Sequence, residues 1–240
     1  MTLKERLIER YAMGGVVGLI YKTVTVPLRE ITNFFLPIFL NIFRKKKFSF
    51  NGEELNYFYH RYNNTWVNER VVETPIAMSF VKKYKGKRIL EIGNVLNHYF
   101  HFPHDVVDKY EVALDVINED VIDFKPQQKY DLIISVSTME HVGWDETPRQ
   151  PEKFLKTFEN LFKNCLVFEG QIVVTLPIGY NAFFDELLKK EKISFFREYF
   201  LKRISRNNSW QEINREEALR IKYGSPFPNA NAIIVGILKK

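Results

Sequence analysis

The sequence predicts an α/β fold, with a central and mostly parallel sheet covered by helices on both faces. Short aliphatic runs alternate along the chain with longer segments of helical spacing. Such runs contain few charges, which is typical of parallel strands buried on both faces. Acidic residues stand at the ends of successive runs, where open α/β sheets place their ligands. These three observations also point to a binding site at the carboxyl edge of the sheet.

The first predicted strand is Ile89–Ile92, which ends at Gly93. Glu91 is the one charge inside this strand, and its carboxylate can accept hydrogen bonds from a ligand in the loop beyond. Gly93 has no Cβ, so the backbone there can turn sharply and approach that ligand closely. A helix over residues 66–84 is expected to lead into this strand.

The remaining strands and helices are predicted from short aliphatic runs and from segments of helical spacing, respectively. Further strands are predicted at 105–108, 112–118, 130–136, 170–176, 195–204 and 230–238. Helices are predicted at 151–164, 183–193 and 216–222. The segment 130–136 is the clearest strand because four of its seven residues are aliphatic: Leu132, Ile133, Ile134 and Val136.

A known family is recognisable in these motifs. Glu91-Ile-Gly93, Asp120, Tyr130–His141 and Gly170–Pro177 resemble, in order and spacing, the class I S-adenosylmethionine-dependent methyltransferases from about residue 66 onward. The resemblance implies a Rossmann-like sheet of seven strands with an antiparallel last strand, and S-adenosylmethionine as the cofactor. The glycine loop is degenerate, because Val95 and Asn97 replace its second and third glycines. Asn97 tolerates positive φ better than most residues, whereas Val95 does not.

The resemblance also implies which residues bind the cofactor. An acid ending the second strand would accept hydrogen bonds from the ribose hydroxyls, and we expect Asp108 in this role, with Asp115 as the competitor. Asp120 would meet the adenine amino group while Val121 packs on the ring. The other cofactor-binding residues expected are Glu91, Gly93, Asn94, Asn97 and Ser137.

Glu140 and His141 follow the fourth predicted strand and are the candidate catalytic residues. A methyl acceptor needs a base only when it must lose a proton, as a hydroxyl does. Histidine, with an ordinary pKa of about 6.5, suits that task. The alternative is that these two residues only fix the loop. Four residues ahead of the first strand are further candidates for the active-site wall: Tyr62, Trp66, Glu69 and Arg70.

Composition excludes several classes of site. One cysteine, Cys165, permits no internal disulfide and no cysteine-rich metal site, and with no cleavable signal peptide evident it favours a cytoplasmic location. His98, His101 and His104 are spaced by three, but Pro103 breaks any helix there, and we expect no metal site. All of the net charge of +6 lies in residues 1–47. The rest is neutral, so no nucleic-acid partner is expected.

Residues 1–47 form a separate apolar and basic arm, ahead of a cap and lead-in helix at 48–85 and a methyltransferase-like domain at 86–240. The arm has helical apolar spacing over Ile31–Phe43, followed by the four basic residues Arg44–Lys47. That run is too short to span a bilayer. Contact with an anionic membrane surface and a helical cap on the main domain are both open interpretations.

The expected function is methyl transfer, with O-methylation favoured, to a small-molecule, glycan or lipid-linked acceptor. The alternatives are a catalytically inactive cofactor-binding or scaffolding protein, suggested by Val95 and Asn97, and a nicotinamide-dependent enzyme. The absence of a Gly-x-Gly-x-x-Gly loop argues against the last of these.

Overall fold

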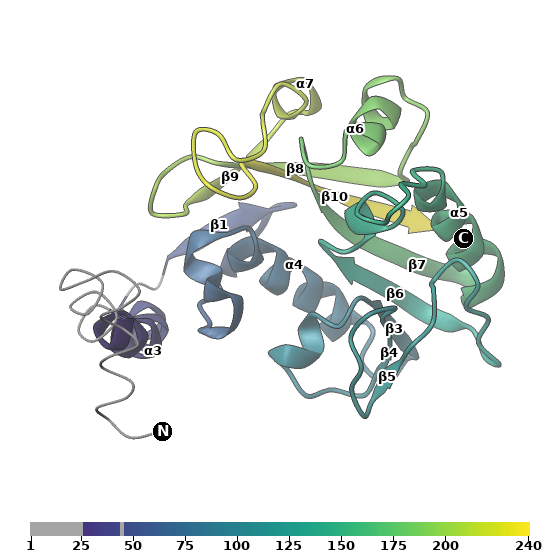
Figure 1. Cartoon of the computed structure of the whole chain (residues 1–240), viewed down its shortest axis with the longest axis horizontal. Helices are drawn as coiled ribbons and strands as arrows, with labels where there is room; N and C mark the ends of the chain where they lie inside the picture. Colours follow the sequence, from purple (N-terminus) through teal and green to yellow (C-terminus); the bar gives the residue numbers. More distant parts are fainter. Residues whose placement is uncertain (1–25, 44–45) are drawn as a thin grey trace, which may run out of the picture.

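The computed structural model describes residues 26–43 and 46–240, with side chains from Phe34 onward. The body is built on one sheet in the order β5-β4-β3-β6-β7-β10-β8-β9 (Figure 1). Its strands, in chain order, are β3 (Ile89–Ile92), β4 (Asp105–Val107), β5 (Val116–Ile117), β6 (Tyr130–Val136), β7 (Leu166–Pro177), β8 (Arg197–Arg203), β9 (Trp210–Ile213) and β10 (Ala232–Lys239).

Strand directions follow the predicted pattern. Strands β5, β4, β3, β6 and β7 are parallel, while β10 lies antiparallel between β7 and β8. The α/β prediction with a mostly parallel sheet is therefore confirmed. The sheet has eight strands rather than the seven expected, because β9 pairs antiparallel with β8 at the edge. This strand has only four residues, two of them polar or charged, and so lacked the aliphatic run that marks the others.

The chain changes direction across the sheet at β3. It adds β4 and β5 on one side of β3 and then β6 and β7 on the other, so Leu90 lies between Asp105 and Ile133. A switch of this kind leaves a crevice outside the carboxyl ends of the two central strands. The site predicted from the sequence lies at this edge.

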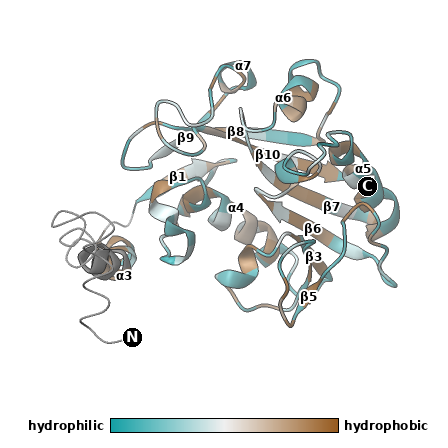
Figure 2. Ribbon diagram, viewed as in Figure 1, coloured by the Kyte–Doolittle hydropathy of each residue, from teal (hydrophilic) through white to brown (hydrophobic). Residues whose placement is uncertain are grey.

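Helices cover both faces, and the central strands are the most apolar part of the ribbon (Figure 2). Helix α4 (Arg70–Lys83) packs on the face that carries Leu132 and Ile134, whereas α5 and α6 pack on the face that carries Ile133. The other helices are α5 (Lys153–Asn160), α6 (Ala182–Lys189) and α7 (Arg215–Ala218), with short helical turns η2 (Tyr62–Val67), η3 (Leu96–His98), η4 (Met139–His141) and the π-helical η5 (Leu161–Cys165).

Several predicted elements are shorter than expected, among them the helices predicted at 151–164, 183–193 and 216–222, and the cause is clear for two others. Helix α4 begins at Arg70 rather than residue 66, because Asn68 is extended (φ −132°, ψ −179°) at the end of η2 and interrupts the helical path. Strand β5 keeps only two residues of the predicted 112–118, since Val112 and Leu114 are exposed and pair with no strand.

A hairpin that the sequence analysis missed precedes α4. Strands β1 (Lys47–Phe50) and β2 (Glu53–Asn56) pair antiparallel around Asn51 and Gly52, both at positive φ. Phe48 and Phe50 point inward and join the core on the α4 face. The hairpin therefore anchors the segment 48–85 on the sheet.

Helix α3 (Val26–Phe43) lies beside the body and is joined to it through β1 (Figure 1). Leu40 is buried against the α4-face core, while Phe34, Phe35, Phe39 and Phe43 are exposed. In the described part of the chain, no helix combines the length and apolar character needed to cross a membrane. Residues 1–25 and Arg44–Lys45 of the predicted arm lie outside the described residues.

Candidate functional site

The loop after β3 turns at Gly93, whose φ is +83°. A Cβ at this position would lie 2.2 Å from Thr138 Oγ1, so the glycine allows the end of β6 to approach the end of β3. The Gly93 N–H donates to the Val107 carbonyl at 2.9 Å and ties the loop to β4. Gly93 thus joins the ends of three parallel strands.

Glu91 shapes this loop from beneath. Its side chain is fully buried, and Oε1 accepts hydrogen bonds from the N–H groups of Val95 (2.9 Å) and Leu96 (2.6 Å). Its Oε2 lies 3.0 Å from His104 Nε2. Burial lowers the pKa of His104, but the hydrogen bonds to Glu91 and the Phe102 carbonyl and the nearby carboxylates together outweigh burial and raise the pKa. Both carboxylate oxygens of Glu91 therefore bind groups of the protein itself, and Glu91 affects a ligand only by fixing the shape of the loop.

Asp108 links the glycine loop to the segment after β4. Oδ1 accepts from the Tyr110 and Glu111 N–H groups at 2.8 Å each, and Oδ2 accepts from the Asn94 N–H at 3.1 Å. A carboxylate offers about four acceptor positions, so about one remains for a ligand. Asn94 donates to Glu111 Oε1 at 2.7 Å, and its buried Oδ1 has no partner among the described residues.

Asp115 and Asn97 lie elsewhere. Both line a shallow groove beside His101, away from the ends of β3 and β6. Asp108, in contrast, lines a cavity of about 390 Å³ at the carboxyl edge of the sheet. We call it the carboxyl-edge cavity, and its wall includes Gly93, Asp108, Glu111, Asp120, Val121 and His141.

A closed ring of four charges forms one wall of this cavity. Lys109 Nζ lies 2.9 Å from both Asp120 Oδ2 and Glu146 Oε1, and Lys153 Nζ lies 3.3 Å and 2.7 Å from the same two carboxylates. Burial alone would raise the pKa of Asp120, but the hydrogen bonds from Lys109 and the Ile122 N–H and the charges of Lys109 and Lys153 together outweigh burial and lower it. Both carboxylates are therefore kept ionised at the cavity.

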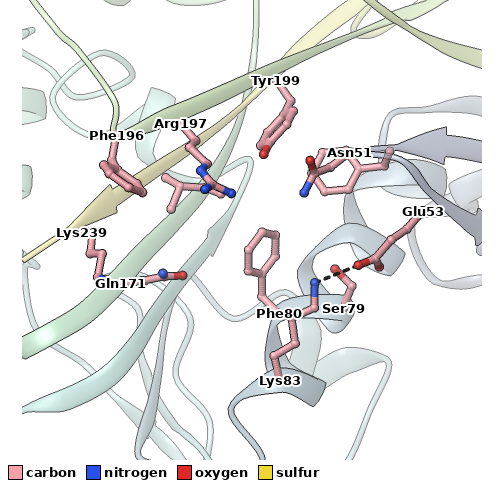
Figure 3. A pocket seen from close by; sticks show the side chains of 12 residues that line it. Asn51, Glu53, Ser79, Phe80, Lys83, Gln171, Phe196, Arg197, Tyr199 and Lys239 are labelled. Atoms are coloured by element: carbon pink, nitrogen blue, oxygen red, sulfur yellow. Dashed lines mark hydrogen bonds and ion pairs between the residues drawn. The ribbon is translucent and has the colours of Figure 1, made fainter.

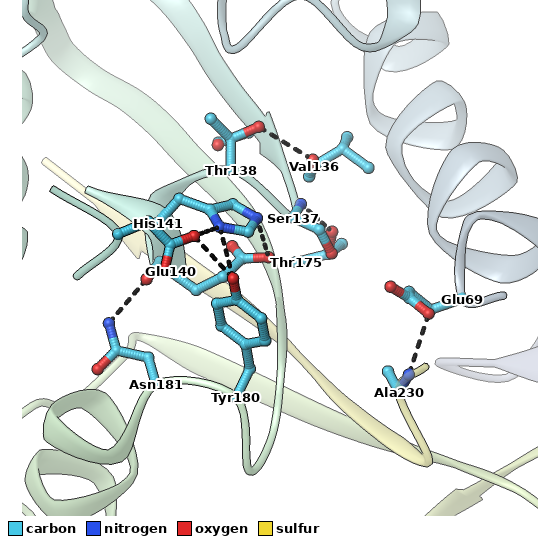
Figure 4. Close-up of polar contacts among 12 residues, drawn as sticks. Glu69, Val136, Ser137, Thr138, Glu140, His141, Thr175, Tyr180, Asn181 and Ala230 are labelled. Carbon is cyan, nitrogen blue, oxygen red and sulfur yellow. Dashed lines mark hydrogen bonds and ion pairs between the residues drawn. The ribbon is translucent and has the colours of Figure 1, made fainter. Parts of the chain in front are cut away.

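His141 is held at the cavity edge by two partners that the sequence did not reveal. Its Nδ1 lies 2.5 Å from Asp145 Oδ2, and the Tyr180 hydroxyl donates to the same carboxylate oxygen at 2.7 Å (Figure 4). The hydrogen bonds from Tyr180 and His141 outweigh burial and lower the pKa of Asp145. An ionised Asp145 favours the tautomer with hydrogen on Nδ1, which leaves a lone pair on Nε2.

Glu140 points the other way, into the interior. It is buried, and burial raises its pKa well above the ordinary value. Oε1 lies 3.7 Å from His141 Nε2, and Oε2 has no hydrogen-bond partner in the described structure. A carboxyl group in this setting holds its proton more tightly than an exposed one does.

Ser137 belongs to a second buried network behind β6. Its hydroxyl donates to Glu73 Oε1 at 2.6 Å, and its carbonyl accepts from Arg70 Nη2 at 3.2 Å. Arg70 Nη1 reaches the Val136 carbonyl (2.6 Å) and Glu73 Oε2 (3.1 Å). Ser137 thus faces α4 and is not part of the wall of the carboxyl-edge cavity.

The other aromatic and acidic candidates near α4 also lie outside that wall. Tyr62 stacks on His98 with ring centroids 4.2 Å apart, Trp66 packs against the α4-face core, and Glu69 Oε2 accepts the Ala230 N–H. Among the described residues, no group of three or more histidine, cysteine, aspartate and glutamate side chains is placed to hold a metal ion.

The strand order decides the fold. Counted along the parallel succession, the sheet runs third, second, first, fourth, fifth, then the antiparallel last strand, then the sixth. The inserted antiparallel strand is the feature that the resemblance implied. The chain has the class I methyltransferase fold. No protein-family model matches the chain, and no curated protein matches it.

Solved structures with some likeness to this chain include methyltransferases. One is a SAM-dependent methyltransferase from Archaeoglobus fulgidus, with 18% identity, 71% of this chain and 94% of that chain covered, and a TM-score of 0.45. The N-methyltransferase NodS from Bradyrhizobium japonicum, solved with S-adenosylhomocysteine, shows 9% identity, 69% and 85% coverage, and a TM-score of 0.42. These TM-scores lie below 0.5, so the fold is assigned on strand order and direction.

The residues that the sequence analysis missed share one property. Lys109, Asp145, Glu146, Lys153 and Tyr180 come from four separate loops or helices, and each has at least one partner far along the chain. The one local indication was His141 and Asp145 at a spacing of four. Such a pair faces the same side of a helical turn.

Proposed function

We propose that the protein is an S-adenosylmethionine-dependent methyltransferase that binds its cofactor in the carboxyl-edge cavity. The observation that carries the proposal is the convergence of Gly93, Asp108 and Asp120, from three successive strand ends, on one cavity at the switch point of the sheet. Asp108 and Asp120 each keep about one free acceptor position, and Glu111 lies beside Asp108 to take a second ribose hydroxyl.

The residues at the cavity fit such a group. Asp108 and Glu111 would hold the ribose, Asp120 the adenine amino group, and the buried Val121 would pack on the ring. When bound, the cofactor supplies a methyl group on a positively charged sulfur. The protein's own contribution is to position the acceptor and to handle its proton.

His141 is the residue we propose for that proton. The Asp145 carboxylate orients its ring and stabilises the imidazolium that forms, while Nε2 takes the proton from an acceptor hydroxyl. Glu140 is buried and does not line the cavity, so it is the poorer candidate of the two. This arrangement supports O-methylation of a hydroxyl-bearing acceptor that is a small molecule, a glycan or a lipid-linked compound.

Calorimetry with S-adenosylmethionine, S-adenosylhomocysteine and NAD tests the cofactor. We expect heat and thermal stabilisation with the first two and none with NAD. Binding of NAD alone, or no binding of the sulfur compounds at millimolar concentration, would contradict the proposal. Binding without turnover on any hydroxyl-bearing acceptor would instead favour an inactive cofactor-binding protein.

The role of His141 is tested by His141→Ala, with His101→Ala as the matched control. His101 is exposed and lies outside the cavity. Loss of a general base lowers turnover by about 10²–10⁴-fold. We expect that loss for His141→Ala only, with S-adenosylhomocysteine affinity retained. Equal turnover in the two variants would show that the acceptor needs no base here.

We also propose that α3 and the basic residues after it contact an anionic membrane surface. Leu40 and Asn41 attach the helix to the body, Asn41 Nδ2 donating to the Tyr59 carbonyl at 2.9 Å. Phe39 and Phe43 of the same helix are exposed, the latter by 72%, and the exposed Lys46 and Lys47 follow the helix in the chain. Each basic residue near an anionic surface contributes about 1 kcal/mol, so Arg44–Lys47 would contribute roughly 4 kcal/mol.

Co-sedimentation with vesicles tests this arm on the full chain. We expect binding to anionic but not to neutral vesicles, weakening as salt rises. The double variant Phe39→Ser/Phe43→Ser should lose binding, while Phe168→Ser, which removes an exposed phenylalanine elsewhere, should keep it. Equal binding of all three proteins, or no binding of any, would contradict a membrane role for α3.

A further inference from the structure

A second cavity lies at the opposite end of the sheet, near the amino ends of β6 and β7. It measures about 270 Å³ and lies between the β1–β2 hairpin, the last turns of α4, and strands β7, β8 and β10 (Figure 3). The cavity reaches Gln171, which the strand register places beside Leu132 at the start of β6. We call it the amino-edge cavity.

The walls of the amino-edge cavity are aromatic. Phe50 and Phe80 are buried side chains at its floor, and Tyr199 packs on Phe50 with ring centroids 5.1 Å apart. Phe196 stands at the edge and is 61% exposed. A large exposed ring beside a cavity leaves apolar surface in water that a bound ring would cover.

The position of Phe196 follows from its neighbour. Phe195 packs over Gly236 of β10 so closely that a Cβ on the glycine would lie 2.4 Å from the ring. Phe195 belongs to the core on the α5 face, whereas Phe196 borders the amino-edge cavity across from Phe80 (Figure 3). The packing of Phe195 on β10 therefore fixes Phe196 at the edge of the cavity.

The same cavity carries an excess of positive charge. Its charged side chains are Lys83, Arg197, Lys239 and Glu53. Lys83 pairs with Glu53 at 3.2 Å. Arg197 lies over the Phe196 ring at 5.6 Å, and neither it nor Lys239 has a carboxylate partner among the described residues.

The two unpaired cations lie where an anion would be favoured. Arg197 begins β8 and Lys239 ends β10. Both lie across the cavity from the carboxyl end of α4, so an anion bound to them stays away from the negative end of that helix dipole. The Gln171 side chain, opposite Lys239 in the register of β7 and β10, can donate from its amide. Guanidinium and ammonium groups bind carboxylates and phosphates through charge-assisted hydrogen bonds.

We propose that the amino-edge cavity is a second ligand site, which binds a planar aromatic ring carrying a carboxylate or a phosphate. The ring lies against Phe80, Phe196 and Tyr199, and the anionic group contacts Arg197 and Lys239. The site is separate from the carboxyl-edge cavity and shares no lining residue with it. Its existence does not depend on methyl transfer.

Calorimetry on the full chain tests the site with matched probes. The probes are 2-naphthoate, 2-naphthyl phosphate and the neutral 2-naphthamide. We expect one or both anions to bind at least tenfold more tightly than the amide, and added salt to reduce that difference. The anion with the higher affinity identifies the preferred group.

Three variants locate the binding. Arg197→Gln and Lys239→Gln remove exposed charges, so both should melt at the wild-type temperature without a probe. Each should weaken anion binding about tenfold, with amide binding unchanged. Lys125→Gln, an exposed lysine outside both cavities, is the control and should bind as wild type.

Equal affinity for the anions and the amide would overturn the proposal, as would anion binding that Arg197→Gln and Lys239→Gln leave unchanged. Absence of binding by all three probes would overturn it as well. None of these outcomes bears on S-adenosylhomocysteine binding, which we expect Arg197→Gln to leave within twofold of wild type.

Discussion

The two sides of the carboxyl edge carry the same kind of residue in opposite electrostatic states. On the cavity side, Asp120 and Asp145 accept hydrogen bonds from cations or hydroxyls, and the pKa of each is lowered. On the α4 side, Glu73 and Glu140 are buried, and the pKa of each is raised. Burial is the largest cause on the α4 side and outweighs even the Arg70 cation beside Glu73, so the position in the fold, and not residue type, sets the pKa of the acids at this edge.

The largest loss of stability is expected from a substitution on the α4 side. Arg70→Met would leave Glu73 buried without its cation, and removing one partner of a buried ion pair costs about 3–5 kcal/mol. Urea denaturation measures the loss. Lys163→Met, which breaks the exposed pair with Glu159, is the control and should change stability little. Equal stability of the two variants would mean that the Arg70 network is dispensable.

A second comparison separates backbone strain from collision at the glycine loop. Gly86 and Gly93 have φ of +80° and +83°, but a Cβ at Gly86 meets nothing within 4 Å. Gly86→Ala should therefore cost about 1 kcal/mol from strain alone. Gly93→Ala adds the clash with Thr138 and should cost about 2–4 kcal/mol in urea denaturation.

The same two glycines should also differ in their effect on cofactor binding. We expect Gly93→Val to abolish S-adenosylhomocysteine binding in a chain that still folds, because the side chain would also narrow the cavity. Gly86→Val should bind as wild type. Normal binding by Gly93→Val would mean that the glycine serves only the turn.

The smallest expected effects are on the pH dependence of stability, and they should have opposite signs for an acid on the α4 side and an acid on the cavity side. Glu140 has a raised pKa, so its ionisation opposes folding as pH rises above its unfolded value of 4.5. Glu140→Gln should then stabilise the protein at pH 8 and not at pH 4. Asp120 has a lowered pKa, so it contributes stability above 3.8 that is lost as pH falls through its folded pKa.

Asp120→Asn should accordingly destabilise the protein at pH 8 and have little effect well below pH 3.8. Thermal melts of both variants across this pH range measure the two trends. Shifts of the same sign at pH 8 would contradict the contrast between the two sides.

Local patterns were enough to predict much of the sheet. Strands β3 and β6 have the predicted bounds, because each is an uninterrupted buried run. The β1–β2 hairpin was also readable, since Asn51-Gly52 is a strong two-residue turn sequence, but it was overlooked among the aromatic residues around it.

The burial and the ion-pair partners of the acids could not be predicted from the local sequence. Glu73 looks like an ordinary helix residue, and its burial depends on contacts with Ser137, 64 positions away. The lysines paired with Asp120 come from 11 residues before it and 33 residues after it. Such pairings are set by tertiary packing, so the sequence identified the acids at the strand ends without showing which of them are free.

The central claim is that the cavity side of the carboxyl edge binds the cofactor, and one measurement tests it most directly. Calorimetry should compare S-adenosylhomocysteine binding by Asp108→Ala and Asp115→Ala. Asp108 lines the carboxyl-edge cavity, and Asp115 is an exposed acid that does not. The expected result is affinity reduced at least tenfold by Asp108→Ala and unchanged by Asp115→Ala. The reverse order, or equal affinities, would contradict the claim.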